Sequence, residues 1–242
     1  MARLARVVVP QIPYHITHRG NRRGRVFLYD TDREAYLAFL ERYCHAHGLH
    51  IWTWCLMSNH IHLLGWPEHT HSISRALGNA HGKYAQWFNQ QHHLSGHVWA
   101  NRFYSTPLDD DHLWTAVRYV ELNPVRAAMC VDAESYAWSS AATHCGISAP
   151  RNSGHGGLHW PTSPFPGEVT CDGWAQWLQS ALNSQQIERI RASTMTGRPC
   201  GSNDFITRLE GELQRILQPQ PSGRKAKALA DKDVTHDMFA EL

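Results

Sequence analysis

Residues Met57–Leu64 read MSNHIHLL and place two histidines, His60 and His62, inside an apolar run. Successive side chains of a β-strand point to opposite faces, so these two imidazoles are expected to share one face of a strand. Ile61 and the two leucines can then be buried. Two imidazoles side by side on a rigid strand supply half of the ligands of a divalent-metal site.

A second polar pair follows in residues 118–126, which read RYVELNPVR. Tyr119 and Asn123 are four residues apart, close to one helical turn, so they are expected to share a helix face. A His-hydrophobe-His strand combined with a helical tyrosine indicates chemistry on a phosphodiester. The metal and the nucleophile would then be carried by separate elements.

Outward from these segments, the hydrophobic pattern switches repeatedly between the periods of strands and helices. Strands are predicted at 14–19, 49–56, 60–66 and 97–106, and helices at 31–47, 72–91 and about 109–123. This order is typical of the ferredoxin-like split β-α-β pattern. The chain is therefore expected to be an α+β protein with an antiparallel sheet, helices on one face and a small helical C-terminal appendage.

Local signals mark the expected ends of the helices. The segment Thr31–Glu34 has the form of a capping box and opens the first helix, which Gly48 ends. The three acids Asp109–Asp111 favour a helix start, where the helix dipole stabilises negative charge. Pro124 disfavours continuation of that helix beyond about Asn123.

The 242 residues are enough for one sizeable domain and an appendage. Residues 146–171 are dense in Gly, Pro and Ser and are expected to link a domain at 1–145 to a helical region at 172–218. The basic tail at 219–242 is expected to be disordered without DNA. Two short helices around the turn at 196–201 fit either a DNA-reading helix-turn-helix or a packing hairpin, and the hairpin is favoured.

Composition narrows the class of protein. No apolar run approaches the roughly 18 residues of a membrane span, and the opening MARLARVVVP is too short a signal for secretion. A cytoplasmic protein is expected. The six cysteines include no C-x-x-C pair, which argues against a zinc module and a secreted disulfide framework.

The net charge of +2 is unevenly distributed along the chain. Before Asp30 there are arginines and no acidic residue, and a second basic cluster lies near the C-terminus. These residues are Arg3, Arg6, Arg19, Arg22, Arg23 and Arg25, and then Arg224, Lys225 and Lys227. Basic ends suit a polyanionic partner, although two solvated tails would have the same composition.

The segments together carry a family resemblance. MSNHIHLL resembles the HUH motif (His, hydrophobe, His) of single-tyrosine transposases, and RYVELNPVR resembles the catalytic helix of the REP-associated branch. The segments YHITHRGNRR and VWANRFYSTPL resemble that branch as well, and TGRPCGSNDF does so less specifically. The tripeptide alone is weak evidence, but the ordered set is strong. The resemblance extends over roughly residues 10–145 and is weak in the last third.

This resemblance implies a metal-dependent transposase that nicks and rejoins single-stranded DNA beside hairpins, such as repetitive extragenic palindromes. Tyr119 would attack the scissile phosphate and leave a 5′-phosphotyrosine and a free 3′-hydroxyl. His60, His62 and Asn123 would hold the metal ion. Whether the protein acts as a monomer or a homodimer stays open.

The chemistry of these residue types agrees with the implied roles. A phenol has a pKa near 10, so forming the phenolate at pH 7 costs about 4 kcal/mol. A divalent ion with open coordination positions can bind phosphate oxygens and neutralise developing charge. A tyrosyl ester conserves the bond energy for rejoining. Mixed N/O ligation suits Mn²⁺ and tolerates Mg²⁺, whereas Zn²⁺ prefers closed tetrahedral sites.

The end of the first predicted strand offers cations, an amide and a flexible glycine, which can hold phosphates and read base edges. The candidates there are Arg19, Asn21, Arg22 and Arg23. By resemblance, this region recognises a short single-stranded guide sequence. Arg102, between aromatic residues, is a further DNA-binding candidate. Its neighbours Trp99 and Phe103 are expected in the core.

Several alternatives stay open. Tyr119 alone fits a core residue, and Asn123 alone fits a residue that ends a helix before proline. The general base could be His112, a metal-bound water or the DNA phosphate, while Glu121 is expected to point away from Tyr119. The rival functions are a non-catalytic hairpin-binding regulator and a nuclease that uses water, which would form no covalent adduct and would tolerate Tyr119→Phe.

Overall fold

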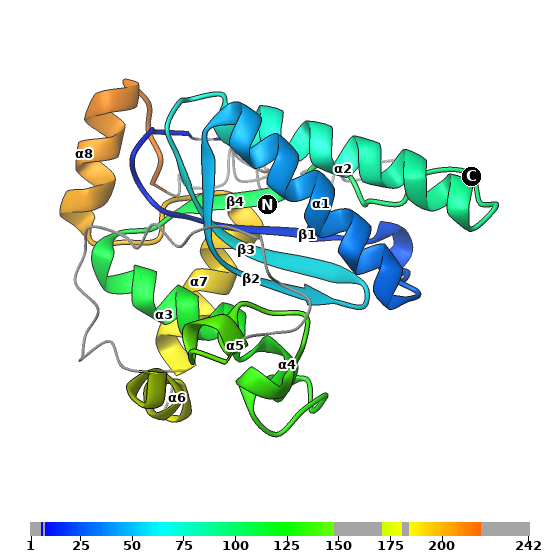
Figure 1. Ribbon diagram of the computed structural model, residues 1–242. Coiled ribbons are helices and arrows are strands. Elements are labelled where there is room, and N and C mark those ends of the chain that lie inside the picture. Colours follow the sequence, from blue (N-terminus) through cyan, green and yellow to red (C-terminus); the bar gives the residue numbers. More distant parts are fainter. Residues whose placement is uncertain (1–5, 7, 148–170, 181–183, 219–242) are drawn as a thin grey trace, which may run out of the picture.

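The computed structural model describes residue 6 and residues 8–147, 171–180 and 184–218. These residues form a four-stranded sheet in the order β2-β3-β1-β4, with helices packed on it (Figure 1). The strands are β1 (Tyr14–Arg19), β2 (Leu49–Met57), β3 (His60–Pro67) and β4 (Tyr104–Pro107). The longer helices are α1 (Asp30–His47), α2 (Ser72–Gln91), α3 (Asp110–Glu121), α6 (Cys171–Gln179), α7 (Ser184–Thr196) and α8 (Asn203–Leu213). The short ones are η1 (Asn21–Arg23), α4 (Asn123–Arg126), η2 (Ala133–Ser135) and α5 (Ala141–His144).

The predicted α+β, ferredoxin-like fold is confirmed. The chain order is β1-α1-β2-β3-α2-β4, and neighbouring strands are antiparallel throughout the sheet. Helices α1 and α2 lie side by side on one face, as Figure 1 shows. The structure adds that α3, α6 and α7 cover the opposite face, where Leu64 of β3 packs in one cluster with Val117 and Ile190. The strands therefore bury apolar residues on both faces.

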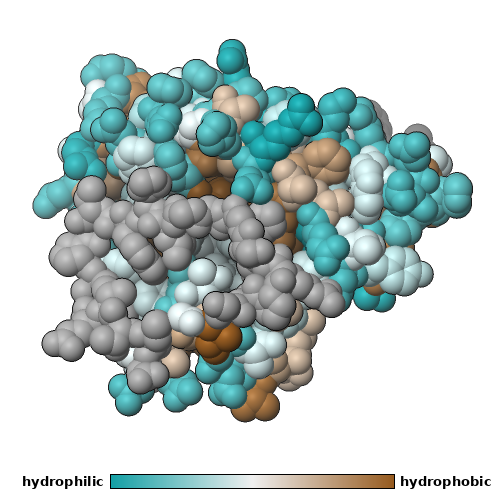
Figure 2. All heavy atoms as spheres, viewed as in Figure 1, coloured by the Kyte–Doolittle hydropathy of each residue, from teal (hydrophilic) through white to brown (hydrophobic). Residues whose placement is uncertain are grey.

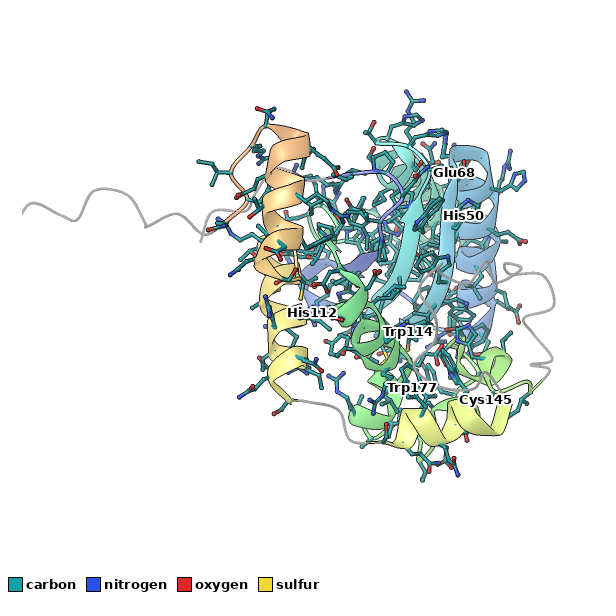
Figure 3. The ribbon with its side chains drawn as sticks, turned by 90° about the vertical axis from the view of Figure 1, so that its left-hand side faces the viewer. His50, Glu68, His112, Trp114, Cys145 and Trp177 are labelled. Carbon is teal, nitrogen blue, oxygen red and sulfur yellow. The ribbon has the colours of Figure 1, made fainter. Side chains whose placement is uncertain are left out.

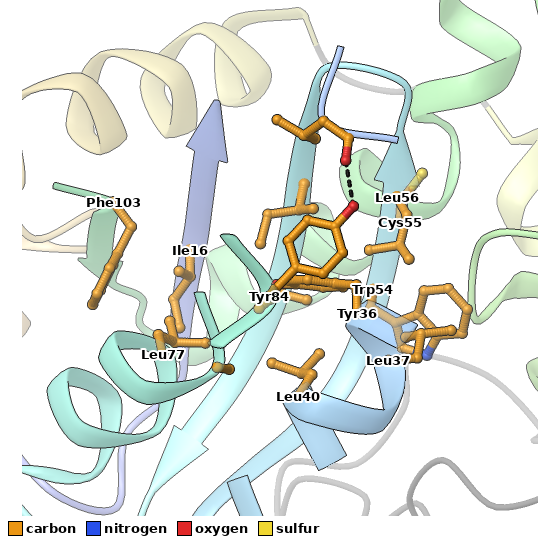
Figure 4. Packing of buried hydrophobic residues seen from close by; sticks show 14 of the residues in the cluster. Ile16, Tyr36, Leu37, Leu40, Trp54, Cys55, Leu56, Leu77, Tyr84 and Phe103 are labelled. Carbon is orange, nitrogen blue, oxygen red and sulfur yellow. Dashed lines mark hydrogen bonds between the residues drawn. The ribbon is translucent and has the colours of Figure 1, made fainter. Parts of the chain in front are cut away.

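The core under α1 and α2 is built around aromatic side chains (Figure 4). Tyr36 of α1 and Tyr84 of α2 meet edge to face, with ring centroids 5.3 Å apart. The Tyr84 hydroxyl donates a hydrogen bond to the Val26 carbonyl. A buried hydroxyl without a partner costs about 1–3 kcal/mol, so this bond fixes the segment before α1 against α2.

The opposite core contains a buried carboxylate on α3. Glu121 accepts hydrogen bonds from Thr53 at 2.7 Å, Ser140 at 2.7 Å and the Trp174 indole at 2.9 Å, and it pairs with His144 at 2.5 Å. Burial raises the pKa of Glu121, but the charge and hydrogen bonds of its partners outweigh burial and hold it below its ordinary value. These contacts join α3 to β2, α5 and α6.

Tryptophan side chains also pack between α3 and α6 at this junction. Trp114 of α3 and Trp177 of α6 pack with ring centroids 5.9 Å apart (Figure 3). Trp174, one turn before Trp177, is almost fully buried. Three of the ten tryptophans of the chain, Trp114, Trp174 and Trp177, therefore serve packing.

The fourth strand is shorter than the predicted 97–106. β4 begins at Tyr104, and Trp99 makes only an isolated bridge with Gly20. Asn101 has a positive φ of 46°, which no extended strand accommodates. The buried rings of Trp99 and Phe103 draw this segment onto the core, as expected for these two residues, and so interrupt the strand pattern.

The capping of α1 differs from the prediction, whereas the end of α3 agrees with it. α1 begins at Asp30, and the Asp32 carboxylate accepts from the backbone N–H groups of Leu28 and Tyr29, so Asp32 provides the capping acid instead of Glu34. α3 ends at Glu121, close to the predicted end near Asn123, and Pro124 lies in the first turn of the separate helix α4, where a helix needs no N–H donor. Gly48 ends α1 with a φ of 62°, as predicted.

The C-terminal helices pack on the rest of the molecule. Ile190 of α7 is fully buried, and α7 contacts α3, β1 and β4. Phe205 and Leu209 of α8 pack against Val9 and Leu217. The two helices join different hydrophobic clusters, so the choice between a hairpin and a helix-turn-helix stays a prediction. Most of the predicted linker and the whole basic tail lie outside the described residues, and the division into domains stays a prediction.

Hydrophilic side chains predominate along the upper and right-hand edges of the face seen in Figure 2. Among the helices that the structure describes, none combines the length and apolar character needed to span a membrane.

Candidate active site

The two motif histidines lie side by side on β3. His60 is opposite Arg19 of β1, and His62 is opposite Thr17. The two imidazole centroids are 5.0 Å apart. Because Ile61 between them points into the α1–α2 core, both rings face α3. The shared face expected from the sequence is therefore present.

Helix α3 brings Tyr119 onto this face. The phenol ring meets His62 edge-on, with centroids 5.6 Å apart, and meets His15 of β1 in the same way at 5.7 Å. Only 6 % of Tyr119 is exposed. The tyrosine and the strand histidines, which are distant in sequence, are thus neighbours in the structure.

Asn123 lies one turn after Tyr119, where α3 gives way to α4. Its amide nitrogen donates to the Tyr119 carbonyl at 2.9 Å. The carbonyl can only accept, so it fixes the amide orientation and turns the side-chain oxygen away from the α3 backbone. The oxygen is the atom that Asn123 would offer to a ligand.

Asn59 sets the orientation of His60. The Asn59 amide nitrogen donates to the Arg23 carbonyl at 3.2 Å, which directs the amide oxygen to Nδ1 of His60 at 2.6 Å. Because the Asn59 oxygen can only accept a hydrogen bond, Nδ1 of His60 must carry the proton that is donated to it. The His60 lone pair then lies on Nε2, as in metal-binding histidines whose other nitrogen is hydrogen-bonded.

The site histidines are electrically neutral near pH 7. Burial lowers the pKa of His60 to about 4, with Arg19 contributing, and lowers the pKa of His15 to about 4. Burial lowers the pKa of His62 well below its ordinary value, with His15, His60 and two arginines adding to the effect. Neutral imidazoles have the lone pairs that a metal requires.

Two imidazole nitrogens and one amide oxygen are donor types that suit Mn²⁺ and accommodate Mg²⁺ with open positions. Ring contacts join His60, His62 and Tyr119, and the Asn123 amide contacts the Tyr119 carbonyl. Within the part of the chain that the structure describes, no group of three or more His, Cys, Asp and Glu side chains is arranged to hold a metal. A metal at His60 and His62 would therefore rely on Asn123 and on substrate or water oxygens.

Two arginines next to Tyr119 were not singled out from the sequence. The Arg126 guanidinium lies over the phenol ring, with Cζ 4.4 Å from the centroid. Nε of Arg191 on α7 lies 3.4 Å from the Tyr119 hydroxyl and donates to it. Arg126 belongs to the RYVELNPVR motif and could have been noticed there, but Arg191 has no local signal.

His15 also belongs to the site, although its role was left unassigned from the sequence. His15 and His18 are three residues apart on β1 and lie on opposite faces of the sheet, since His15 contacts His62 and His18 contacts His81 under α2. Nε2 of His15 is 3.0 Å from Nδ1 of His62, and Nδ1 of His15 is 2.9 Å from the Thr194 hydroxyl.

The two side chains considered as bases have other partners. Nδ1 of His112 lies 2.6 Å from Asp109 at the start of α3 (Figure 3). Glu121 points away from Tyr119, as its spacing on α3 led us to expect, and is hydrogen-bonded to Thr53 and Ser140. Neither contact involves the Tyr119 hydroxyl.

The DNA-binding candidates lie in two neighbouring loops. Arg19 ends β1 and Asn21–Arg23 form η1, all four exposed. Arg102, also exposed, follows a segment bound to this turn, because Asn21 N–H donates to the Val98 carbonyl at 2.9 Å and Ala100 N–H to the Arg19 carbonyl at 2.8 Å. The two loops thus lie next to the His60 end of β3.

Comparison with known proteins shows which family and which solved structures this chain resembles. Residues 8–123 match the family described as "Transposase IS200 like". A solved structure of a REP-associated tyrosine transposase bound to a REP hairpin has a TM-score of 0.52 and 18% identity, covering 70% of this chain and 94% of that chain. A putative transposase from Deinococcus radiodurans R1 has a TM-score of 0.36 and 19% identity, with 50% and 96% covered. No curated protein matches the sequence.

The family match spans every residue from the strand histidines to Asn123 and confirms the resemblance drawn from the motifs. Residues 8–123 are therefore similar to the IS200-like transposase family. The solved transposase shares the fold of this chain. The family match supports a transposase function for the protein.

Proposed function

We propose that the protein nicks and rejoins single-stranded DNA beside hairpins through a 5′-phosphotyrosine intermediate. The observation that carries the proposal is the packing of Tyr119 against His62, with His60 beside it on the same face. A nucleophile and two neutral metal-binding side chains on separate rigid elements suit in-line attack on a phosphodiester.

Tyr119 is the nucleophile in this proposal. Its oxygen bonds to phosphorus while the bond from phosphorus to the 3′ oxygen breaks, and the leaving oxygen regains a proton to become the 3′-hydroxyl. Arg191, which donates to the Tyr119 hydroxyl, stabilises the phenolate as the proton leaves. Such help is needed because the phenolate costs about 4 kcal/mol at pH 7.

His60, His62 and Asn123 would hold a Mg²⁺ or Mn²⁺ ion. The ion supplies positive charge to the phosphate oxygens when it is bound. Asn59 and His15 hold the two imidazoles in place, and Arg126 covers the outer face of the phenol ring. The side chains therefore orient the nucleophile before DNA arrives.

Hairpin DNA is the proposed partner. The solved transposase of similar fold is bound to a REP hairpin, and exposed arginines lie next to the His60 end of the sheet here. Arg19, Asn21, Arg22 and Arg23 would contact the single-stranded segment beside the hairpin, with Arg102 in the adjoining loop. Phosphate contacts would position the DNA and base edges would give selectivity.

The first test is a denaturing gel of protein with labelled single-stranded hairpin DNA and Mn²⁺. We expect a protein-linked DNA band that Tyr119→Phe abolishes and that Tyr43→Phe, the same chemical change on α1, preserves. A variant without the phenol oxygen cannot form the ester.

Other results would contradict the proposal in distinct ways. Cleavage that persists in Tyr119→Phe without an adduct would identify a nuclease that uses water. Hairpin binding with neither adduct nor cleavage, across several candidate hairpins, would identify a non-catalytic regulator.

A further inference from the structure

Helix α7 reaches the active-site face through Thr194. The Thr194 hydroxyl lies 2.7 Å from the Ile190 carbonyl and 2.9 Å from Nδ1 of His15, and Nε2 of His15 lies 3.0 Å from Nδ1 of His62. His15, Thr194 and His62 are all buried. An unbroken series of hydrogen bonds therefore runs from the C-terminal region to a motif histidine.

The direction of this series follows from its first member. A carbonyl can only accept, and two oxygens 2.7 Å apart repel unless a proton lies between them, so Thr194 donates its single hydroxyl proton to Ile190. The Thr194 oxygen must then accept from His15. The proton of neutral His15 is consequently on Nδ1, which leaves Nε2 as an acceptor.

The next step assigns the proton of His62. Nε2 of His15 accepts, so Nδ1 of His62 donates, and the lone pair of neutral His62 is left on Nε2. The surroundings of His15 suit the neutral ring, since it is 1 % exposed and contacts Thr194, His62 and Tyr119. A doubly protonated His15 would instead donate to His62 and remove its Nε2 lone pair.

We propose that Thr194 and His15 are positioning residues that hold His62 in the tautomer with its proton on Nδ1 and its Nε2 lone pair free for a divalent ion. The role of that lone pair rests on the proposed function. The tautomer itself is a property of the metal-free protein. His60 finds the acceptor for its Nδ1 proton in the neighbouring Asn59, whereas His62 finds it in His15, which Thr194 of α7 orients.

The same helix also reaches the nucleophile. Arg191 lies three residues before Thr194, on the adjacent turn of α7, and contacts the Tyr119 hydroxyl. Thus one helix outside the segment that matches the transposase family contacts both His15 and Tyr119. This arrangement gives the C-terminal region a specific part in building the site.

The first measurement is the histidine ¹⁵N–¹H spectrum of the full-length, metal-free protein. We expect His15 and His62 to be protonated on Nδ1. Thr194→Val keeps the side-chain shape and removes the hydroxyl, so both rings should become tautomer mixtures. Thr194→Ser keeps the hydroxyl and should retain the wild-type spectrum. Protonation of wild-type His62 on Nε2 would overturn the proposal.

The second measurement is titration with MnCl₂, followed by electron paramagnetic resonance. Thr194→Val should weaken Mn²⁺ binding in proportion to the fraction of His62 that loses its Nε2 lone pair, about twofold for an equal mixture of tautomers. Thr194→Ser should bind as wild type does. Equal binding by Thr194→Val and wild type would overturn the proposal.

A double variant separates positioning from simple packing. The amide oxygen of His15→Gln can accept from His62 with no help from Thr194, so adding Thr194→Val to His15→Gln should leave Mn²⁺ affinity unchanged. If Thr194→Val lowered the Mn²⁺ affinity equally in the wild type and in His15→Gln, Thr194 would act through packing alone, and the proposal would be overturned. If the wild-type protein binds no Mn²⁺, the proposed metal site fails. The histidine spectra then still test whether Thr194 and His15 fix the tautomer of His62.

Discussion

Strand β1 carries one histidine on each face of the sheet, and the two faces use histidine differently. Under α2, His18 and His81 join through Nδ1 at 2.8 Å, while their Nε2 atoms contact the Ala100 carbonyl at 3.2 Å and the Tyr36 hydroxyl at 3.0 Å. Both nitrogens of each ring are thus committed to the protein. These rings are polar components of the core.

On the α3 face, the pattern of hydrogen bonds is different. His60 and His62 are held through Nδ1, by Asn59 and His15 respectively, and this leaves Nε2 as the nitrogen that can bind a metal. Burial and proximity are similar on the two faces, so the partners of the individual nitrogens are what separate the proposed metal-binding histidines from the core histidines.

The largest expected effect comes from removing the two histidines of the α3 face that are proposed to bind a metal. His60→Ala combined with His62→Ala should abolish DNA cleavage while hairpin binding persists, because the metal loses both imidazoles. The loss of metal-assisted charge stabilisation corresponds to several kcal/mol. Cleavage gels and gel-shift titrations measure the two properties.

A matched control uses another histidine pair with the same spacing. His69 and His71 stack with centroids 5.3 Å apart and lie in an exposed turn before α2. His69→Ala with His71→Ala should leave cleavage intact. Unaltered cleavage in the His60 and His62 variant would remove the metal-site claim.

A smaller expected effect is a loss of stability at acidic pH, to which buried histidines on both faces of the sheet contribute. Burial lowers the pKa of His15 to about 4 and that of His81 well below its ordinary value. The unfolded chain therefore binds more protons than the folded protein between pH 6.5 and about 4, and stability must fall as pH falls through this range. His15 alone should contribute a loss of about 2 kcal/mol from pH 6.5 to 5.

Urea unfolding at pH 7 and pH 5, without and with MnCl₂, measures this loss. We expect Mn²⁺ to stabilise the wild type at pH 7, by mass action on the folded state, and not to stabilise the His60 and His62 double variant. Stability that is constant or greater at pH 5 would refute the assigned burial effect.

The smallest expected effect concerns the loop beside the α3 face. Arg22→Ala with Arg23→Ala should weaken binding of single-stranded hairpin DNA and flatten its salt dependence, by about 0.7 in log–log slope for each lost phosphate contact. Binding isotherms at several salt concentrations measure the slope. Arg42→Ala with Arg75→Ala, exposed cations on α1 and α2, is the control. A slope unchanged by the η1 substitutions would place the DNA surface elsewhere.

The fold was predictable where the hydrophobic period was clear. The bounds of β1 and α2 agree with the predictions, and the prediction for β3 misses only its last residue. The predictions were less accurate at β4, where buried aromatic residues override the strand pattern, and at α1, where Asp32 caps from inside the first turn. Helical cover on both sheet faces also went beyond the prediction.

Alternation along extended backbone was enough to place His60 and His62 on one face and to separate His15 from His18, because neighbouring strand side chains point in opposite directions. The helical period paired Tyr119 with Asn123 in the same way. No such local rule links Arg191 to Tyr119, 72 residues apart, or Thr194 to His15, 179 residues apart. Those contacts exist because α7 packs its buried side across the sheet, and packing between distant segments leaves no periodic trace in the chain.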